Sequence, residues 1–231
     1  MRASCDALEL LDARPPFTRE HLCALGVAGL QFGAWDGRQP GCLNTDVVGL
    51  TSGTSVTRPG RIYRVDDATY FVELDARQPL PFTSGCVDWV YAEHVIEHIT
   101  LDEAIGWLRE VRRVLAPGGV VRLTTPDLGR YARAYVEEDG AFFEEHGRRL
   151  AELGAGADLS SRRAFMMNQL FQFYGHRWIY DWDELRHALG QAGFAAGAIA
   201  RRAFRHGSLP AVACLDRAVR DDETIYVEAS T

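Results

Sequence analysis

Short apolar runs alternate with longer amphipathic stretches along this chain of 231 residues. Seven runs have the length and composition of β-strands, and they cover residues 27–32, 43–50, 69–76, 87–92, 120–125, 198–204 and 224–230. Between the fourth and fifth runs, Ala104, Leu108 and Val111 recur at helical spacing, and the pattern ends at Pro117 and two glycines. A strand, a crossover helix and a second strand favour parallel pairing. We therefore expect an α/β doubly wound sheet, covered on both faces because its strands are apolar throughout.

Composition and charge narrow the class of protein. Hydrophobic residues make up 47% and charged residues 25% of the chain, which is the balance of an ordinary globular domain. The net charge of −7 disfavours binding to nucleic acid, and the absence of lysine excludes lysine Schiff-base chemistry. No signal peptide, membrane span, repeat or long linker stands out, so we expect one domain over residues 1–231 and no membrane partner. Five scattered cysteines without a paired spacing predict a reducing, cytoplasmic setting.

Chemically useful residues follow the predicted strands at their carboxyl ends. Gly33 comes directly after the first run, Asp46 lies within the second, and Asp75 lies at the end of the third. Glu93 and His94 follow the fourth run. Ligands of doubly wound sheets bind beyond the carboxyl ends of the strands. We therefore predict a binding site at this edge of the sheet.

The segments around these residues resemble the class I S-adenosylmethionine-dependent methyltransferases. They occur in the order typical of that family and span most of the chain: FGAWDGRQPGCLNTD (32–46), LDARQPLPF (74–82), VDWVYAEHVIEHI (87–99), LREVRRVLAPGGVVRLTTPDL (108–128), GHRWIYDWDELRHALGQAGF (175–194) and IYVEA (225–229). The resemblance implies a Rossmann-like, seven-stranded methyltransferase fold, mostly parallel with an antiparallel last strand. It also implies S-adenosylmethionine as the cofactor.

The resemblance assigns the cofactor contacts residue by residue. Gly33 would form the tight turn beside the methionine part of S-adenosylmethionine, and the carboxylate of Asp46 would accept hydrogen bonds from the ribose hydroxyls. Asp75, with the backbone of Ala76, would contact the edge of the adenine ring. Each aspartate also has a structural alternative, as the cap of a turn or a helix. The methionyl group would be lined by Tyr91, Ala92 and Glu93.

The first glycine motif departs from the family pattern. The usual motif is Gly-x-Gly, because a side chain on the second glycine would collide with the cofactor. This chain has Gly33, Ala34 and Trp35 instead. Either Trp35 fills the methionyl pocket and no cofactor binds, or the register slips so that Gly33 and Gly37 both form the turn. Use of the cofactor is therefore predicted separately from the fold.

The segment HVIEH (94–98) also has the spacing of helical zinc sites. On a helix, His94 and His98 would share one face, with Glu97 as a base. The spacing suggests no third ligand, so we predict no metal. Within the family resemblance, Glu97 and His98 hold the following helix against loops, while His94 faces the cleft, where an imidazole can exchange a proton near neutral pH. We predict His94 and Asp46 as the catalytic residues.

The stretch 163–185 is rich in methionine and aromatic residues. It is consistent with a buried cap helix, a lid over the cleft, or a partner-binding face, and we place this insertion at residues 155–185. A partner-binding face would form a homo- or hetero-oligomer. A lid would contact the substrate beside His94 through His176, Arg177, Trp178 and Tyr180. Candidates for an anion-binding fork are Arg61, Arg64, Arg122, Arg177, Arg201, Arg202 and Arg205.

Three hypotheses for the function follow from these features. The first is a methyltransferase that acts on a small metabolite in bacterial specialised metabolism, such as antibiotic biosynthesis. The second keeps the fold without the cofactor and uses the cleft for an elimination or ring closure with an anionic leaving group; Trp35 is the feature that supports it. The third is a non-catalytic subunit that binds a partner through residues 163–185.

Overall fold

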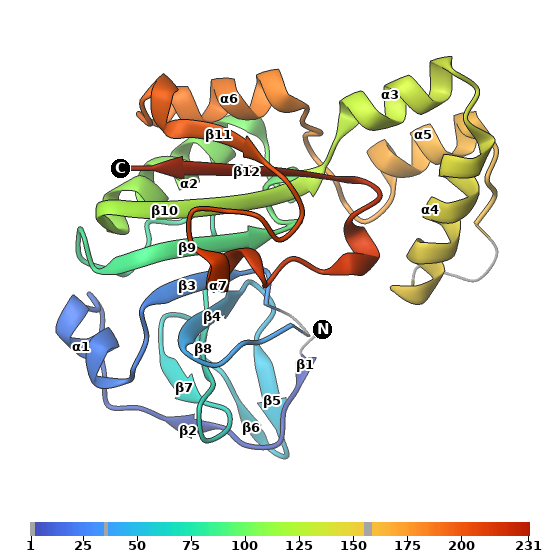
Figure 1. Cartoon of the computed structure of the whole chain (residues 1–231). Helices are drawn as coiled ribbons and strands as arrows, with labels where there is room; N and C mark the ends of the chain where they lie inside the picture. Colours follow the sequence, from blue (N-terminus) through green and yellow to red (C-terminus); the bar gives the residue numbers. More distant parts are fainter. Residues whose placement is uncertain (1–2, 35–36, 155–158) are drawn as a thin grey trace.

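The computed structural model describes residues 3–34, 37–154 and 159–231. Within this part of the chain, the main sheet has nine strands in the order β11-β12-β10-β9-β3-β4-β8-β7-β2. β12 (Thr224–Ser230) runs antiparallel to β10, and β11 (Ile199–Arg202) runs antiparallel to β12. The predicted α/β fold class is confirmed (Figure 1). The five central strands are parallel: β3 (Gly29–Phe32), β4 (Cys42–Asp46), β8 (Tyr70–Glu73), β9 (Val87–Glu93) and β10 (Leu115–Pro126).

The sheet is wider than the seven strands that we predicted. β7 (Ile62–Arg64) and β2 (Glu9–Leu10) extend it beyond β8 in antiparallel orientation. The predicted strand 43–50 ends at Asp46, where the carboxylate accepts a hydrogen bond from the amide of Val48 and closes a turn. Strands of two or three residues are too short to show an alternating pattern, so the sequence did not predict them. Three such strands form a separate small sheet: β1 (Ala3–Ser4), β5 (Leu50–Ser52) and β6 (Ser55–Val56).

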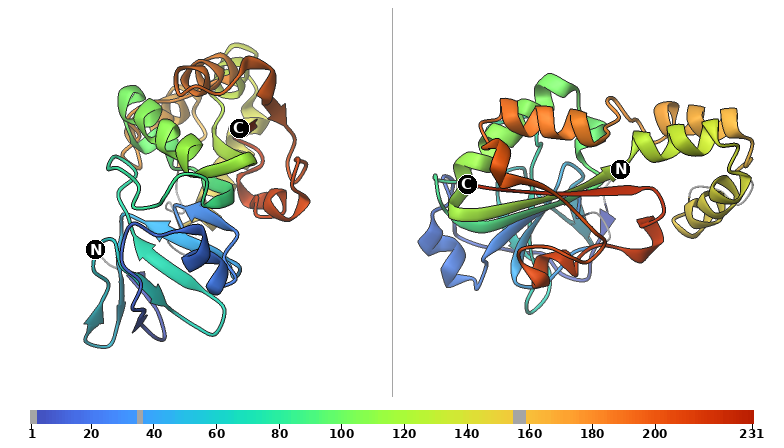
Figure 2. Two further views of the ribbon diagram at one scale, coloured as in Figure 1. Left: turned by 90° about the vertical axis from the view of Figure 1, so that its left-hand side faces the viewer. Right: turned by 45° about the horizontal axis from the view of Figure 1, so that its top comes forward.

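Two helices cover one face of the main sheet, as Figures 1 and 2 show. α2 (Leu101–Val114) begins with a capping box, in which Thr100 and Glu103 satisfy each other's backbone amides. Its buried side packs with α6 (Trp182–Gln191) and the sheet strands into the main hydrophobic core. A short helix, α1 (Arg19–Ala24), precedes β3. In the described part of the chain, every helix is too short or too polar to cross a lipid bilayer.

The opposite face, at β10 and β12, is covered by the connection from β11 to β12 (Figure 2). This connection contains α7 (Pro210–Ala213) and η3 (Ala218–Arg220), while η2 (Ala196–Ala198) precedes β11. A doubly wound sheet would carry crossover helices on this face. The described parts of connections 33–41, 47–69 and 74–86 instead contain loops and short strands.

A buried arginine fixes this connection to the sheet. Arg122 on β10 has a fully buried side chain, and its Nε and Nη2 atoms donate to the carboxylate of Asp216. Its remaining N–H groups donate to Glu228 on β12 and to the carbonyl oxygens of Ala203 and His206. All five donors of the guanidinium are therefore used within the fold. The interpretation of Arg122 as part of an anion-binding fork is wrong for this reason.

Three helices form a lobe beyond the carboxyl end of β10 (Figure 1). They are α3 (Leu128–Val136), α4 (Gly140–Glu152) and α5 (Arg163–Gln172). We predicted a cap over 155–185; its residues 155–158 lie outside the described residues, and its last residues, 182–185, belong to α6. Its role as a lid or a partner-binding insertion stays a prediction. The apolar residues of the lobe form a core of their own: Tyr131, Ala134, Phe143, Leu150, Met166 and Leu170.

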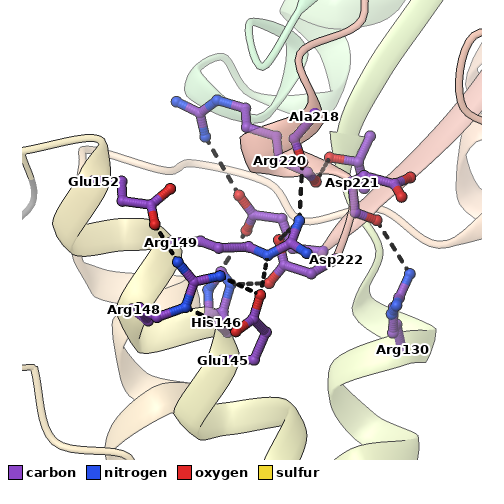
Figure 3. A network of polar contacts seen from close by, with 12 residues as sticks. Arg130, Glu145, His146, Arg148, Arg149, Glu152, Ala218, Arg220, Asp221 and Asp222 are labelled. Carbon is purple, nitrogen blue, oxygen red and sulfur yellow. Dashed lines mark hydrogen bonds and ion pairs between the residues drawn. The ribbon is translucent and has the colours of Figure 1, made fainter.

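A polar network ties the lobe to the segment before β12 (Figure 3). Nδ1 of the buried His146, on α4, lies 2.8 Å from a carboxylate oxygen of Asp222. Arg149, one turn further along α4, donates to the carbonyl oxygen of Ala218. The lobe is thereby held against the segment that carries Arg220 toward the ends of the central strands.

Candidate functional site

A cavity of about 680 Å³, here called the strand-end cavity, opens at the carboxyl ends of β3, β4, β8 and β9. A second cavity of about 590 Å³, here called the lobe cavity, lies between these strand ends and the helical lobe. The residues predicted from the strand ends all line the strand-end cavity: Gly33, Asp46, Asp75, Glu93 and His94. The two cavities adjoin, because both are lined by His94, His98, Leu153, Tyr174 and Arg220.

Gly33 forms a turn directly after β3 that requires glycine. Its φ of +70° lies in the left-handed region, which side chains disfavour. A Cβ atom here would lie 2.5 Å from Cγ2 of Val95 and 3.3 Å from the carbonyl oxygen of Glu93. Both neighbours belong to the wall of the strand-end cavity. A side chain at this position would therefore distort that wall.

Asp46 ends β4 at the wall of the strand-end cavity. Its Oδ1 atom accepts a hydrogen bond of 2.8 Å from the amide of Val48, so the turn cap that the sequence allowed as an alternative is present. Its carbonyl oxygen accepts the amide of Leu74, next to β8. An ionised carboxylate has about four acceptor positions, so capping this turn is compatible with binding a ligand.

Asp75 follows β8 and lines the same cavity together with Ala76. Nε of Arg77 lies 2.9 Å from Oδ1 of Asp75, and Nη2 lies 2.6 Å from Oδ2. These hydrogen bonds from Arg77 lower the pKa of Asp75 below its ordinary value. The carboxylate is therefore ionised and oriented at neutral pH, and a ligand donor at this point shares it with Arg77.

Glu93 ends β9 and is held by an arginine from the β11–β12 connection. Arg217 binds the carboxylate of Glu93 with both its guanidinium and its backbone amide. The hydroxyl of Tyr91 lies 3.4 Å from the same carboxylate. Tyr91 and Ala92 are themselves buried in the sheet and line neither cavity. Of the three residues predicted to line the methionyl group, Glu93 is the one that faces the strand-end cavity.

The predicted glycine motif is described in part. Trp35 lies outside the described residues. The carbonyl oxygen of Gly37 accepts hydrogen bonds from the side-chain amides of Gln31 and Gln39. Of the two glycines proposed to form the turn, Gly33 lines the strand-end cavity and Gly37 does not.

His94 lies between the two cavities, with a left-handed backbone φ of +52°. Its Nε2 atom lies 2.9 Å from the hydroxyl of Thr224, and this hydroxyl donates to the carbonyl oxygen of Arg220. The oxygen of Thr224 is thus the acceptor for a hydrogen on Nε2. We assign the neutral tautomer on this basis, which leaves Nδ1 of His94 as the nitrogen that accepts a proton.

Glu97 is a fully buried carboxylate beside His94. Its Oε2 atom accepts a hydrogen bond from Thr125, while Oε1 lies 3.2 Å from Nδ1 of His94 in an orientation that makes no hydrogen bond. Burial raises the pKa of Glu97, but the positive charge of nearby histidines in their protonated form outweighs this effect and lowers the pKa to about 2; these histidines are His94, His98 and His176. Glu97 is therefore an anion at the wall of the lobe cavity.

The HVIEH segment forms a short 3-10 helix, η1 (Ile96–His98), ahead of α2, whereas we expected the start of a longer helix. The sequence pattern offered His94 and His98 as metal ligands with Glu97 as a base, and it suggested no third ligand. The group that the structure brings together is a different one, because it contains Glu97 and His98 but not His94. Its third member, His176, comes from the connection between α5 and α6. The ligand atoms of these three side chains lie within 4.8 Å of one another, and among the described residues they form a group able to hold a metal ion.

The residues predicted to contact a substrate separate in the structure. His94 and His176 line the lobe cavity. Arg177 and Trp178 donate their backbone amides to a carbonyl oxygen of η1, but they line a separate, smaller hollow of about 350 Å³ that shares only His176 with the lobe cavity. Tyr180 is fully buried in the main core. The lobe cavity therefore brings together two of the five predicted contacts.

Two arginines of the site were missing from the sequence prediction. Arg217 holds Glu93, and Arg220 lines both cavities, with Nη1 3.3 Å from Nδ1 of His94. Nη1 of Arg220 also lies 3.3 Å from the carboxylate of Glu223. The mixed-charge run at 217–223, directly before the last predicted strand, was the available signal.

Residues 31–123 match the family model described as "Methyltransferase domain". The matched segment begins in β3 and ends in β10, so it contains the five strand-end residues from Gly33 to His94. The resemblance to class I methyltransferases is confirmed over this segment. None of the curated proteins matches the sequence of the chain.

The solved structures similar to this chain include methyltransferases at low sequence identity. An S-adenosylmethionine-dependent methyltransferase from Mesorhizobium loti is 13% identical, with 93% of this chain and 98% of that chain covered and a TM-score of 0.45. The CurJ carbon methyltransferase is 14% identical, with 89% and 48% covered and a TM-score of 0.45. A possible exported protein from Bordetella parapertussis is 12% identical, with 92% and 65% covered and a TM-score of 0.45. The chain thus spans about half of the length of the CurJ methyltransferase and 65% of the length of the Bordetella protein.

Proposed function

We propose that this chain, whose residues 31–123 match the family model of a methyltransferase domain, transfers the methyl group of S-adenosylmethionine to a small metabolite. The observation that carries the proposal is the strand-end cavity, where Gly33, Asp46 and Asp75 converge from the ends of three parallel strands. Nucleotide ligands of such sheets bind at this edge. A small acceptor is favoured by the size of the adjoining lobe cavity, about 590 Å³.

The residues around the strand-end cavity fit S-adenosylmethionine. A volume of about 680 Å³ lies within the range of small-molecule sites. Asp46 offers a carboxylate to the two ribose hydroxyls, and Asp75 offers one beside Ala76 for the amino group of the adenine. Gly33 keeps the turn free of a side chain that would distort the cavity wall.

His94 is placed to take a proton from the acceptor. When bound, S-adenosylmethionine supplies a methyl group on a positively charged sulfur, which an oxygen, nitrogen or carbon nucleophile attacks. An acceptor in the lobe cavity lies against His94, where the two cavities adjoin. Thr224 fixes the ring through Nε2, so that Nδ1 receives the proton. Glu97, with Oε1 3.2 Å from Nδ1, stabilises the resulting imidazolium.

We expect Asp46→Ala to weaken the binding of S-adenosylmethionine by about 1.5–3 kcal/mol, the contribution of hydrogen bonds to a charged acceptor. Isothermal titration calorimetry measures the dissociation constant. Asp46→Asn controls for the loss of the turn cap, because its amide oxygen still accepts the hydrogen bond from the amide of Val48. This variant should keep the thermal stability of the wild-type chain, although it loses the negative charge and one acceptor for the ligand. An unchanged dissociation constant in Asp46→Ala would remove Asp46 from the site.

The other hypotheses for the function remain predictions. Cofactor-independent elimination or ring closure rests on Trp35, which lies outside the described residues. Bacterial specialised metabolism, antibiotic biosynthesis and a cytoplasmic location are also expectations from the sequence. Two further hypotheses are a homo- or hetero-oligomer formed through 163–185 and a non-catalytic subunit that binds a partner through this face. Large exposed side chains in this segment support them: Phe171, Phe173, Tyr174 and Trp178.

A further inference from the structure

Three side chains of the lobe cavity have the chemistry of a metal site. Glu97 and His98 come from η1, and His176 comes from the connection between α5 and α6. All three line the lobe cavity. Two imidazoles and one carboxylate are a ligand set of catalytic zinc sites and of non-haem iron(II) sites, which keep further coordination positions open.

The buried carboxylate supplies a second, independent observation. Glu97 has no exposed surface, and its Oε1 atom makes no hydrogen bond in the described part of the chain, although Nδ1 of His94 lies 3.2 Å from it. Leaving a buried carboxylate oxygen without a hydrogen bond costs free energy, and such oxygens are usually paired with a charged group or coordinate a metal ion. Oε2 of Glu97 accepts the hydroxyl of Thr125, which orients the carboxylate.

His176 is oriented as a ligand. Its Nδ1 atom lies 2.7 Å from the carbonyl oxygen of Leu170 and donates to it, because a carbonyl can only accept. In the neutral ring, this fixes the hydrogen on Nδ1 and leaves the lone pair on Nε2. Metal-binding histidines generally donate their second nitrogen to a carbonyl or carboxylate in this way.

We propose that Glu97, His98 and His176 bind one divalent transition-metal ion such as Zn²⁺. The open coordination positions of the ion would face the lobe cavity. Bonds to zinc are about 2.0–2.3 Å long, so ligand atoms up to 4.8 Å apart have to close slightly around the ion. His98 permits this movement, since the residue is exposed and no hydrogen bond in the described chain fixes its ring, which makes an edge-to-face contact with the ring of His176. An ion here offers a Lewis acid to an oxygen or nitrogen of the bound acceptor.

The test uses the full chain without a histidine tag, stripped with a chelator and titrated with ZnCl₂ in a calorimeter. We expect one Zn²⁺ per chain, with a dissociation constant in the micromolar range or below. His98→Ala and His176→Ala should each raise that constant at least about tenfold, as the loss of a ligand does. The matched control is His187→Ala, an exposed histidine on α6, which should bind Zn²⁺ as the wild-type chain does.

Folding and function are controlled separately. Glu97→Gln changes a fully buried ligand, so we measure its melting temperature before its affinity for Zn²⁺. If this variant unfolds, the conclusion rests on the variants of the two less buried histidines. Asp46→Ala should keep its affinity for Zn²⁺ while losing affinity for S-adenosylmethionine, so failure of the proposed function and failure of the metal site are distinguishable. The assignment is overturned if the wild-type chain binds no Zn²⁺, if both histidine variants bind it unchanged, or if Mg²⁺ binds more tightly.

Discussion

Arg122→Met is expected to lower the free energy of unfolding by about 3–5 kcal/mol, because removing one partner of a buried ion pair leaves the other charge uncompensated. The side chains of Arg122 and Asp216 are both fully buried, and that of Glu228 is nearly so. Glu228 keeps a second partner in Arg202, so the larger penalty falls on Asp216. Urea denaturation followed by circular dichroism measures the change.

Arg148→Met is the matched control for this prediction. Arg148 also forms ion pairs with two carboxylates, those of Glu145 and Glu152, but all three side chains are exposed on α4 (Figure 3). Solvent screens such pairs, so this substitution should change the stability little. Equal losses in the two variants would contradict the idea that the buried pair holds the β11–β12 connection on the sheet.

His94→Gln is expected to lower the turnover number by about 100-fold, the usual contribution of a general base. Glutamine can donate and accept hydrogen bonds but cannot take the proton that Nδ1 of His94 takes. His94→Asn provides a second variant, since asparagine tolerates the left-handed φ of +52° better than glutamine does. Release of S-adenosylhomocysteine with an acceptor that the wild-type chain methylates gives the rate.

Binding of S-adenosylmethionine should change little in the two His94 variants, because the proposed contacts to ribose and adenine come from other strands. The control is His187→Gln, on the exposed side of α6, which should turn over as the wild-type chain does. Full activity in either His94 variant would assign the proton transfer to another group.

The central strands were predictable because each is a run of apolar residues long enough to be recognised. β9, for example, has five hydrophobic residues among its seven, and it precedes a helix whose capping-box residues and apolar face can be recognised in the sequence. The helical lobe was not predicted as a unit, because the predicted cap over 155–185 includes α5 but neither α3 nor α4. α4 carries five charged residues among its 13, and the apolar residues of the lobe form a core only when the three helices meet.

The site residues at the strand ends could be predicted from the sequence. The residues that distant segments bring into the site could not. Gly33, Asp46 and Asp75 follow strands, so their convergence follows from parallel pairing. Arg217 reaches Glu93 because the β11–β12 connection is fixed to the sheet by buried contacts with distant residues. His176 lies 79 residues after Glu97 in the sequence, and the two side chains meet only because the lobe folds against the strand ends.

Titration of the wild-type chain with S-adenosylhomocysteine in a calorimeter tests the central claim most directly. The account predicts heat of binding to one site per chain, together with a rise in melting temperature, because a ligand that binds only the folded state stabilises it. Neither heat nor a thermal shift at millimolar ligand would contradict the assignment of the strand-end cavity to this cofactor and would favour cofactor-independent chemistry in the same cleft.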